Sequence, residues 1–249
     1  MSGTSRLRSA VITAPAKLTV SLRVTGVRAD GYHSIDAEMV TLDLGDVLTI
    51  DPSVGVEVEV VDQTGRPMYV GDPADNLAAK AARLAGVGAR ICIHKRIPPG
   101  AGLGGGSADA AAVLRWAGFS DIAAAVELGA DVPFCLAGGR ARVRGIGEQV
   151  EPLPYVRQTF TLLTPPFGCN TAAVYRAWDD LGGPVGVNGN DLEAAALAVE
   201  PRLAEFRARL AAHSGQTPRL AGSGSTWFVE GAFPGEGLVV VTTVPAVAA

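Results

Sequence analysis

The chain has 249 residues, of which 48% are hydrophobic and 18% charged, and its formal net charge at pH 7 is −4. This balance predicts a globular protein with a sizeable core, and the acidic charge argues against a broad surface for nucleic acid or an anionic membrane. The few scattered cysteines, Cys92, Cys135 and Cys169, argue against a disulfide framework and a zinc site and are typical of a reducing compartment. We expect no membrane span, no secretory signal and a cytoplasmic location, because no apolar run approaches about 18 residues.

The first half of the chain reads mainly as strands. Residues 11–26 alternate after Pro15, which predicts a strand with Leu18, Val20, Leu22 and Val24 on one face and Lys17, Thr19, Ser21 and Arg23 on the other. An Asp-Gly turn at 28–33 precedes strands at 38–51 and 54–62, a helix at 74–86 and a strand at 89–98. A short helix, a Gly-Ala-Asp turn and an apolar stretch fill 121–139, and 141–153 completes this half.

The second half adds a strand at 157–166, a helix at 171–181, a loop at 182–190 and a helical stretch at 192–212 that Pro201 interrupts. Strands within 220–231 and 237–244 follow, with a second glycine-rich turn at 222–224. This order predicts an α+β protein in two layers. The Pro-containing segment at 151–154 is the best boundary, so we expect domains at 1–152 and 153–249.

Five glycines occupy seven positions directly before an alanine-rich helix, and they are Gly100, Gly102, Gly104, Gly105 and Gly106. A helix beginning near an N-capping Ser107 would aim free N–H groups into this loop, which predicts an anion site, most often for phosphate. The pattern is not a P-loop, because no Lys-Ser/Thr pair follows the last glycine, nor a dinucleotide fingerprint in its usual setting. A flexible turn before a helix is the alternative interpretation.

Other candidate residues are not decisive when taken singly. Taken alone, Lys17 reads as a surface lysine, Asp131 as a turn cap, and His33 as a lone loop histidine. Cys92 and His94 resemble half of a metal site without a second pair. The turn at 222–224 is either a second loop that approaches phosphate or a plain tight turn.

The combination is specific. PPGAGLGGGSADAA at 98–111 resembles the phosphate-binding motif of the GHMP kinase superfamily, which includes galactokinase, homoserine kinase and mevalonate kinase. The segments at 15–33, 128–134, 144–153 and 220–228 resemble the branch that phosphorylates the 2-hydroxyl of 4-diphosphocytidyl-2-C-methyl-D-erythritol in the non-mevalonate isoprenoid pathway. The order and rough spacing match across nearly the whole chain.

The resemblance implies a two-domain α+β GHMP kinase fold. Its N-terminal domain would be like domain 2 of ribosomal protein S5, its C-terminal domain would be ferredoxin-like, and the active site would lie in the cleft between them. It also implies ATP and Mg²⁺, a small-molecule substrate that carries cytidine diphosphate, no nucleic-acid or membrane partner, and a monomer or homodimer.

The resemblance also implies roles for individual residues. Asp131 matches the catalytic base and Lys17 its lysine partner, which would keep Asp131 ionised. The ATP-binding positions are Asn76, Lys95, Pro99, Gly100, Ala101, Gly102, Leu103, Gly104, Gly105, Gly106, Ser107 and Asp109, with Ser107 also a candidate Mg²⁺ contact. The substrate positions are Thr19, Tyr32, His33, Thr171, Tyr175 and Gly224, where His33 would read cytosine and the two tyrosines would stack on its faces.

Some features depart from the family pattern. Thr19 stands where the family usually has Asn, and a hydroxyl replaces one amide hydrogen bond but not two. The chain is also short near 85–89, 116–127 and the C-terminus, which we interpret as peripheral deletions. The alternatives are another GHMP kinase, of the homoserine or mevalonate type, and a catalytically silent nucleotide-binding protein. The RADGYH segment at 28–33 argues against the first, and the presence of both Lys17 and Asp131 argues against the second.

Overall fold

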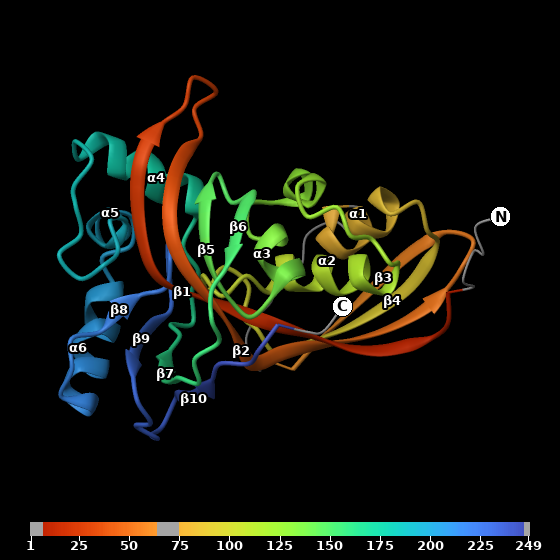
Figure 1. Cartoon of the computed structure of the whole chain (residues 1–249). Coiled ribbons are helices and arrows are strands. Elements are labelled where there is room, and N and C mark those ends of the chain that lie inside the picture. The colour runs from red at the N-terminus through yellow and green to blue at the C-terminus, as the bar shows by residue number, and fades with distance from the viewer. Residues whose placement is uncertain (1–6, 64–74, 247–249) are drawn as a thin grey trace.

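A computed structural model provides the fold, and it describes residues 7–63 and 75–246. The strands of these residues form two sheets, and a long hairpin that belongs to the larger sheet extends toward the second half of the chain (Figure 1). The larger sheet ends at Pro152 and the smaller begins at Thr159. The domain boundary at 152/153 is compatible with this division and stays a prediction.

The six-stranded sheet is organised around β2. Its strands are β1 (Ala10–Val27), β2 (His33–Pro52), β3 (Val56–Asp62), β4 (Ala89–Lys95), β5 (Arg140–Gly145) and β6 (Gln149–Pro152). β1 runs antiparallel along one edge of β2, while the other edge pairs with β5 over Ile35–Val40 and with β4 over Val47–Pro52. Residues 41–46 of β2 pair with neither β4 nor β5. β4 ends beside these residues, so the glycine loop that follows it starts next to the middle of β2.

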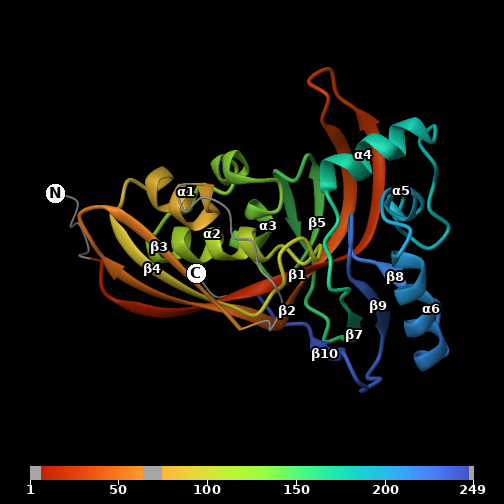
Figure 2. The same ribbon diagram turned by 180° about the vertical axis from the view of Figure 1, so that it is seen from behind.

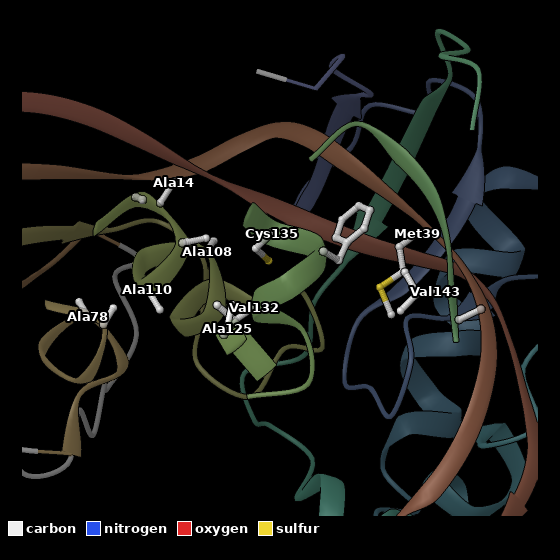
Figure 3. Close-up of a cluster of buried hydrophobic side chains, with 14 of the residues drawn as sticks. Ala14, Met39, Ala78, Ala108, Ala110, Ala125, Val132, Cys135 and Val143 are labelled. Carbon is white, nitrogen blue, oxygen red and sulfur yellow. The ribbon is translucent and has the colours of Figure 1, made fainter. Parts of the chain in front are cut away.

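Three helices and one 3₁₀ helix cover one face of this sheet (Figure 2). They are α1 (Leu77–Leu84), α2 (Gly105–Trp116), η2 (Ala124–Leu128) and α3 (Val132–Ala137). Alanines of α1 and α2, including Ala78, Ala108 and Ala110, are fully or almost fully buried, and small side chains let helices approach closely. Figure 3 shows these residues in the core with Val132 and Cys135 of α3.

The four-stranded sheet has the order β10-β7-β9-β8. Its strands are β7 (Thr159–Leu163), β8 (Arg219–Leu220), β9 (Trp227–Glu230) and β10 (Leu238–Thr242), and its helices are α4 (Thr171–Asp180), α5 (Glu193–Val199) and α6 (Leu203–Ser214). α4 lies beside the free end of the β1–β2 hairpin in both views (Figures 1 and 2). No helix in the described ranges is long and apolar enough to cross a membrane.

Two local expectations are wrong. The simple alternation predicted for β1 fails because register shifts occur between Pro15 and Lys17 and between Thr19 and Ser21. Lys17 and Thr19 are only 5% and 2% exposed, so at these two positions the face opposite Leu18 is buried as well, whereas Arg23, expected on the same face, is exposed. The helix expected near Ser107 begins at Gly105, and its N-cap is Gly104 in the left-handed conformation with no side-chain cap. Ser107 therefore lies in the first turn of α2 and is not its cap.

Candidate active site

The glycine loop requires glycine where it contacts other segments. Gly102 has φ +77°, and a Cβ there would lie 2.5 Å from the carbonyl oxygen of Ala221. Gly104 has φ +67°, and its Cβ would lie 2.7 Å from Cγ of Lys17. Both positions therefore exclude side chains, by backbone conformation and by space. The glycine loop therefore packs closely between β1 and the second glycine turn.

A cavity of about 400 Å³, which we call the donor cavity, opens at the N-terminus of α2. Of the predicted ATP-binding residues, all but Leu103 line it: Asn76, Lys95, Pro99, Gly100, Ala101, Gly102, Gly104, Gly105, Gly106, Ser107 and Asp109. Leu103 is buried instead, and its carbonyl oxygen accepts a hydrogen bond of 3.0 Å from the Lys17 amide. Asn76 caps α1, where its side chain accepts from the Ala78 amide. The cavity thus joins a glycine loop to a helix N-terminus, an arrangement that binds anions.

Lys17 and Asp131 form the ion pair expected between them. Nζ of Lys17 lies 3.1 Å from Oδ2 of Asp131 and donates a 3.1 Å hydrogen bond to Oγ1 of Thr19. Asp131 occupies the N-cap position of α3 but makes no side-chain cap bond. The lysine is buried while the aspartate side chain is 32% exposed. A carboxylate held in this way faces a cavity and can accept a proton.

A second cavity of about 170 Å³, the acceptor cavity, lies on the other side of this pair. It is lined by the predicted substrate residues Thr19, Thr171, Tyr175 and Gly224, together with Lys17 and Asp131. The two cavities share Gly100, Gly102, Asp131 and Thr171. Asp131 therefore stands at the junction of the two spaces. Ser223, which the sequence reasoning missed, lines the acceptor cavity and shares a 3.0 Å hydrogen bond with Thr171.

The aromatic residues predicted to hold cytosine are not equivalent in the structure. The His33 ring packs against Tyr175, with centroids 4.8 Å apart, and edge-on against Trp178. Its Nε2 lies 2.8 Å from the carboxylate of Asp179. Burial, with a contribution from the Asp131 charge, raises the pKa of Tyr175. Tyr32 lies at the hairpin end, is 61% exposed and is not among the residues that line the acceptor cavity.

The segment of the second glycine turn forms hydrogen bonds with the glycine loop. The amides of Ser225 and Thr226 donate to the carbonyl oxygens of Gly100 and Ala101, at 3.3 and 3.1 Å. This turn lies between β8 and β9, so the smaller sheet supports the glycine loop directly. The site is consequently assembled from both halves of the chain.

Lys95 is held by two buried carboxylates, one of which the sequence reasoning missed. It forms ion pairs with Asp46 of β2 and, at 2.9 Å, with Asp109 of α2. Burial would lower the pKa of Lys95, but the charges of Asp109 and Asp46 outweigh it and raise that pKa. Burial also raises the pKa of Asp109 to about 7 despite the neighbouring Lys95 charge. The available signal for Asp46 was a charged residue inside an apolar strand.

No cluster of three or more His, Cys, Asp or Glu side chains that could hold a metal occurs within 7–63 and 75–246. Cys92 and His94 lie 3.7 Å apart on β4, outside both cavities. The three cysteines are free, and burial raises the pKa of each thiol, to about 12 for Cys135.

The chain is similar to known kinases over most of its length. Residues 69–139 match the family model described as GHMP kinases N terminal domain. A protein of Paracoccus denitrificans (strain Pd 1222) named 4-diphosphocytidyl-2-C-methyl-D-erythritol kinase is 43% identical over 86% of this chain and 84% of its own. A solved structure of 4-(cytidine 5'-diphospho)-2C-methyl-D-erythritol kinase is 32% identical, with a TM-score of 0.72 over 94% of this chain and 99% of its own. Homoserine kinase from Cytophaga hutchinsonii shares the fold, at 17% identity and a TM-score of 0.57 over 99% of this chain and 98% of its own.

Proposed function

Because this chain belongs to the 4-diphosphocytidyl-2-C-methyl-D-erythritol kinase family, we propose that it transfers the γ-phosphoryl group of ATP to the 2-hydroxyl of that cytidyl compound. It is a phosphotransferase with an alcohol acceptor and has the GHMP kinase fold. The single observation that carries the proposal is the Lys17–Asp131 ion pair at the junction of the two cavities. ATP would occupy the donor cavity and the alcohol the acceptor cavity.

The proton of the attacking hydroxyl passes to Asp131 in this proposal. Lys17 binds Oδ2 of Asp131, and Oδ1 is the oxygen that would face the hydroxyl. The Lys17 ammonium holds the aspartate carboxylate in place before transfer, and the Thr19 hydroxyl, which accepts a hydrogen bond from that ammonium, fixes its direction. Phosphoryl transfer has a loose transition state, so positioning and charge stabilisation matter more than the strength of the base.

The glycine loop would bind the phosphates. Residues at the start of α2 line the donor cavity, so the free N–H groups of this helix end would face the phosphates, and Gly102 and Gly104 leave no side chain between the loop and its neighbours. Mg²⁺ bound with the nucleotide would neutralise part of the phosphate charge. We propose that Ser107, in the first turn of α2, would hold this ion. Phosphate oxygens would provide most of the other ligands, since the described residues offer no acidic cluster.

Cytosine would bind at the hairpin end of the acceptor cavity. Tyr175 lines this cavity and His33 packs on its ring, so a base that reaches Tyr175 also comes close to His33. Tyr32 would close over the base from the hairpin end. The cytoplasmic location and the monomeric or homodimeric state expected from the sequence remain proposals.

The assay for this function measures ADP release from pure protein, ATP and Mg²⁺ with the cytidyl substrate. Homoserine and mevalonate serve as alternative acceptors under the same conditions. We expect ADP release to depend on the cytidyl substrate and to stay at background with the other two alcohols. Background release with the cytidyl substrate contradicts the proposal, and release with homoserine or mevalonate instead assigns the protein to another GHMP activity.

A further inference from the structure

Asp46 lies beneath the entrance to the glycine loop and uses both of its carboxylate oxygens. Oδ1 accepts from the amides of Arg96 and Ile97, at 2.5 and 2.8 Å. Oδ2 accepts from the ammonium of Lys95. Asp46 is completely buried at the middle of β2, whereas the residues that it holds lead directly into the loop.

Lys95 connects this carboxylate to the first turns of α2. Its ammonium also donates to Oδ2 of Asp109, and a Cβ on Gly105 would lie 3.1 Å from it. An ammonium has three hydrogens, so two ion pairs leave one hydrogen for a ligand in the donor cavity, which Lys95 lines. The ammonium therefore lies beside the first residue of α2.

The two carboxylates on Lys95 are not equivalent. Asp46 has three donors on its two oxygens, while Oδ1 of Asp109 has no hydrogen-bond partner in the described part of the chain. Loss of the Asp46 charge would release the loop entrance and the lysine together. Loss of the Asp109 charge would leave the Asp46 contacts in place.

We propose that Asp46 is a positioning residue for the nucleotide, which sets the glycine loop through Arg96 and Ile97 and aims Lys95 into the donor cavity. The inference rests on the proposed function for the identity of the nucleotide. Lys95 and Ile97 line the donor cavity and do not line the acceptor cavity. Asp46 consequently acts on ATP binding and not on binding of the alcohol.

The test compares Asp46→Asn with Asp109→Asn and with Asp43→Asn. Asparagine has nearly the same size as aspartate but only one acceptor oxygen. Both oxygens of Asp46 accept from donors, so the NH₂ group of the variant must face either the backbone amides or the Lys95 ammonium. Asp43 is a matched control on the same strand, because it also accepts a backbone hydrogen bond, from Thr242, and lines neither cavity. Calorimetry with the β,γ-imido analogue of ATP measures binding without any acceptor, and steady-state kinetics then give the KM of each substrate.

We expect Asp46→Asn to raise the Kd of the analogue and the KM for ATP by about tenfold or more, with kcat at saturating ATP and the acceptor KM changed by less than about twofold. Asp109→Asn changes the Kd by a smaller factor, and Asp43→Asn leaves it unchanged. Equal effects of Asp46→Asn and Asp109→Asn, or an acceptor KM that rises as much as that for ATP, would overturn the inference. Because the analogue needs no alcohol, this result is independent of whether the cytidyl compound is the acceptor.

Hydrogen exchange on the unmodified protein provides a second measurement if Asp46→Asn proves too unstable to assay. We expect the amides of Arg96 and Ile97 to exchange slowly without nucleotide, since Asp46 already holds them. The analogue should slow exchange at Gly104 and Gly105 and leave these two amides unchanged. Fast exchange of Arg96 and Ile97 in the free protein would contradict a preformed loop entrance.

Discussion

The donor and acceptor cavities are built from different kinds of segment. The donor cavity is lined mainly by residues 95–109, a continuous stretch in which backbone and glycine predominate. The acceptor cavity collects side chains from β1, β2, the start of α3, α4 and the second glycine turn. In the proposed function the phosphates of ATP are bound mainly by backbone donors, whereas a particular alcohol needs side chains from many places. The donor cavity is thus the general part of the site, and the acceptor cavity is the part specific to the substrate.

The largest expected effect lies at the junction of the two cavities. Asp131→Asn should lower kcat about 100- to 10,000-fold, because an amide cannot accept the hydroxyl proton. Calorimetric affinity for the imido analogue of ATP should change by less than about threefold, since Lys17 and the glycine loop remain. A loss of nucleotide affinity with kcat retained would place Asp131 in the donor cavity alone.

Gly102→Ala should displace the glycine loop and weaken nucleotide binding. The new Cβ would meet the Ala221 carbonyl at 2.5 Å in a left-handed conformation, so the loop must move. We expect nucleotide affinity to fall on the order of ten- to a hundredfold. Gly55→Ala is the matched control, because nothing lies within 4 Å of its Cβ and its φ is not positive. If both variants bind the analogue equally well, the close contact does not constrain the loop.

Tyr175→Ala should weaken binding of the cytidyl substrate and leave ATP binding unchanged. Loss of one stacking face for a base typically costs about tenfold in affinity, so the KM of the cytidyl substrate should rise by about that factor. Tyr32→Ala should have a smaller effect, since Tyr32 does not line the cavity. A rise in the KM for ATP on Tyr175→Ala, or a larger effect at Tyr32, would show that this division between the two residues is wrong.

The smallest effect is expected at Thr19. Thr19→Val keeps the shape but removes the oxygen that accepts from Lys17, so kcat should fall by about fivefold. Thr19→Ser keeps the hydroxyl and serves as the control, with activity near that of the unmodified protein. An undiminished kcat in Thr19→Val would mean that Asp131 alone orients the ammonium.

The donor cavity could be predicted from the sequence largely because its determinants are local. Glycines directly before an alanine-rich helix specify a loop and a helix N-terminus without reference to the rest of the chain. The error at Ser107 arose because a serine at a helix start suggests a cap, whereas Gly104 adopts the left-handed conformation and begins the helix earlier.

The remainder of the site depends on tertiary packing and was less predictable. The burial of Lys17 follows from bulges in β1 and from the second glycine turn, neither of which a two-residue period reveals. Asp46 contacts residues about fifty positions away, so its place inside an apolar strand marked it as unusual without indicating its partners. The His33–Asp179 contact likewise joins the hairpin to α4 across more than a hundred residues.

Nuclear magnetic resonance of the reaction product tests the central claim most directly. The cytidyl substrate is incubated with ATP, Mg²⁺ and either the unmodified protein or Asp131→Asn, and ³¹P and ¹³C spectra are recorded. We predict a new phosphomonoester coupled to the carbon that bears the 2-hydroxyl, formed by the unmodified protein and not detectably by the variant in the same time. An unchanged substrate, or a phosphoryl group on another hydroxyl, would contradict the account.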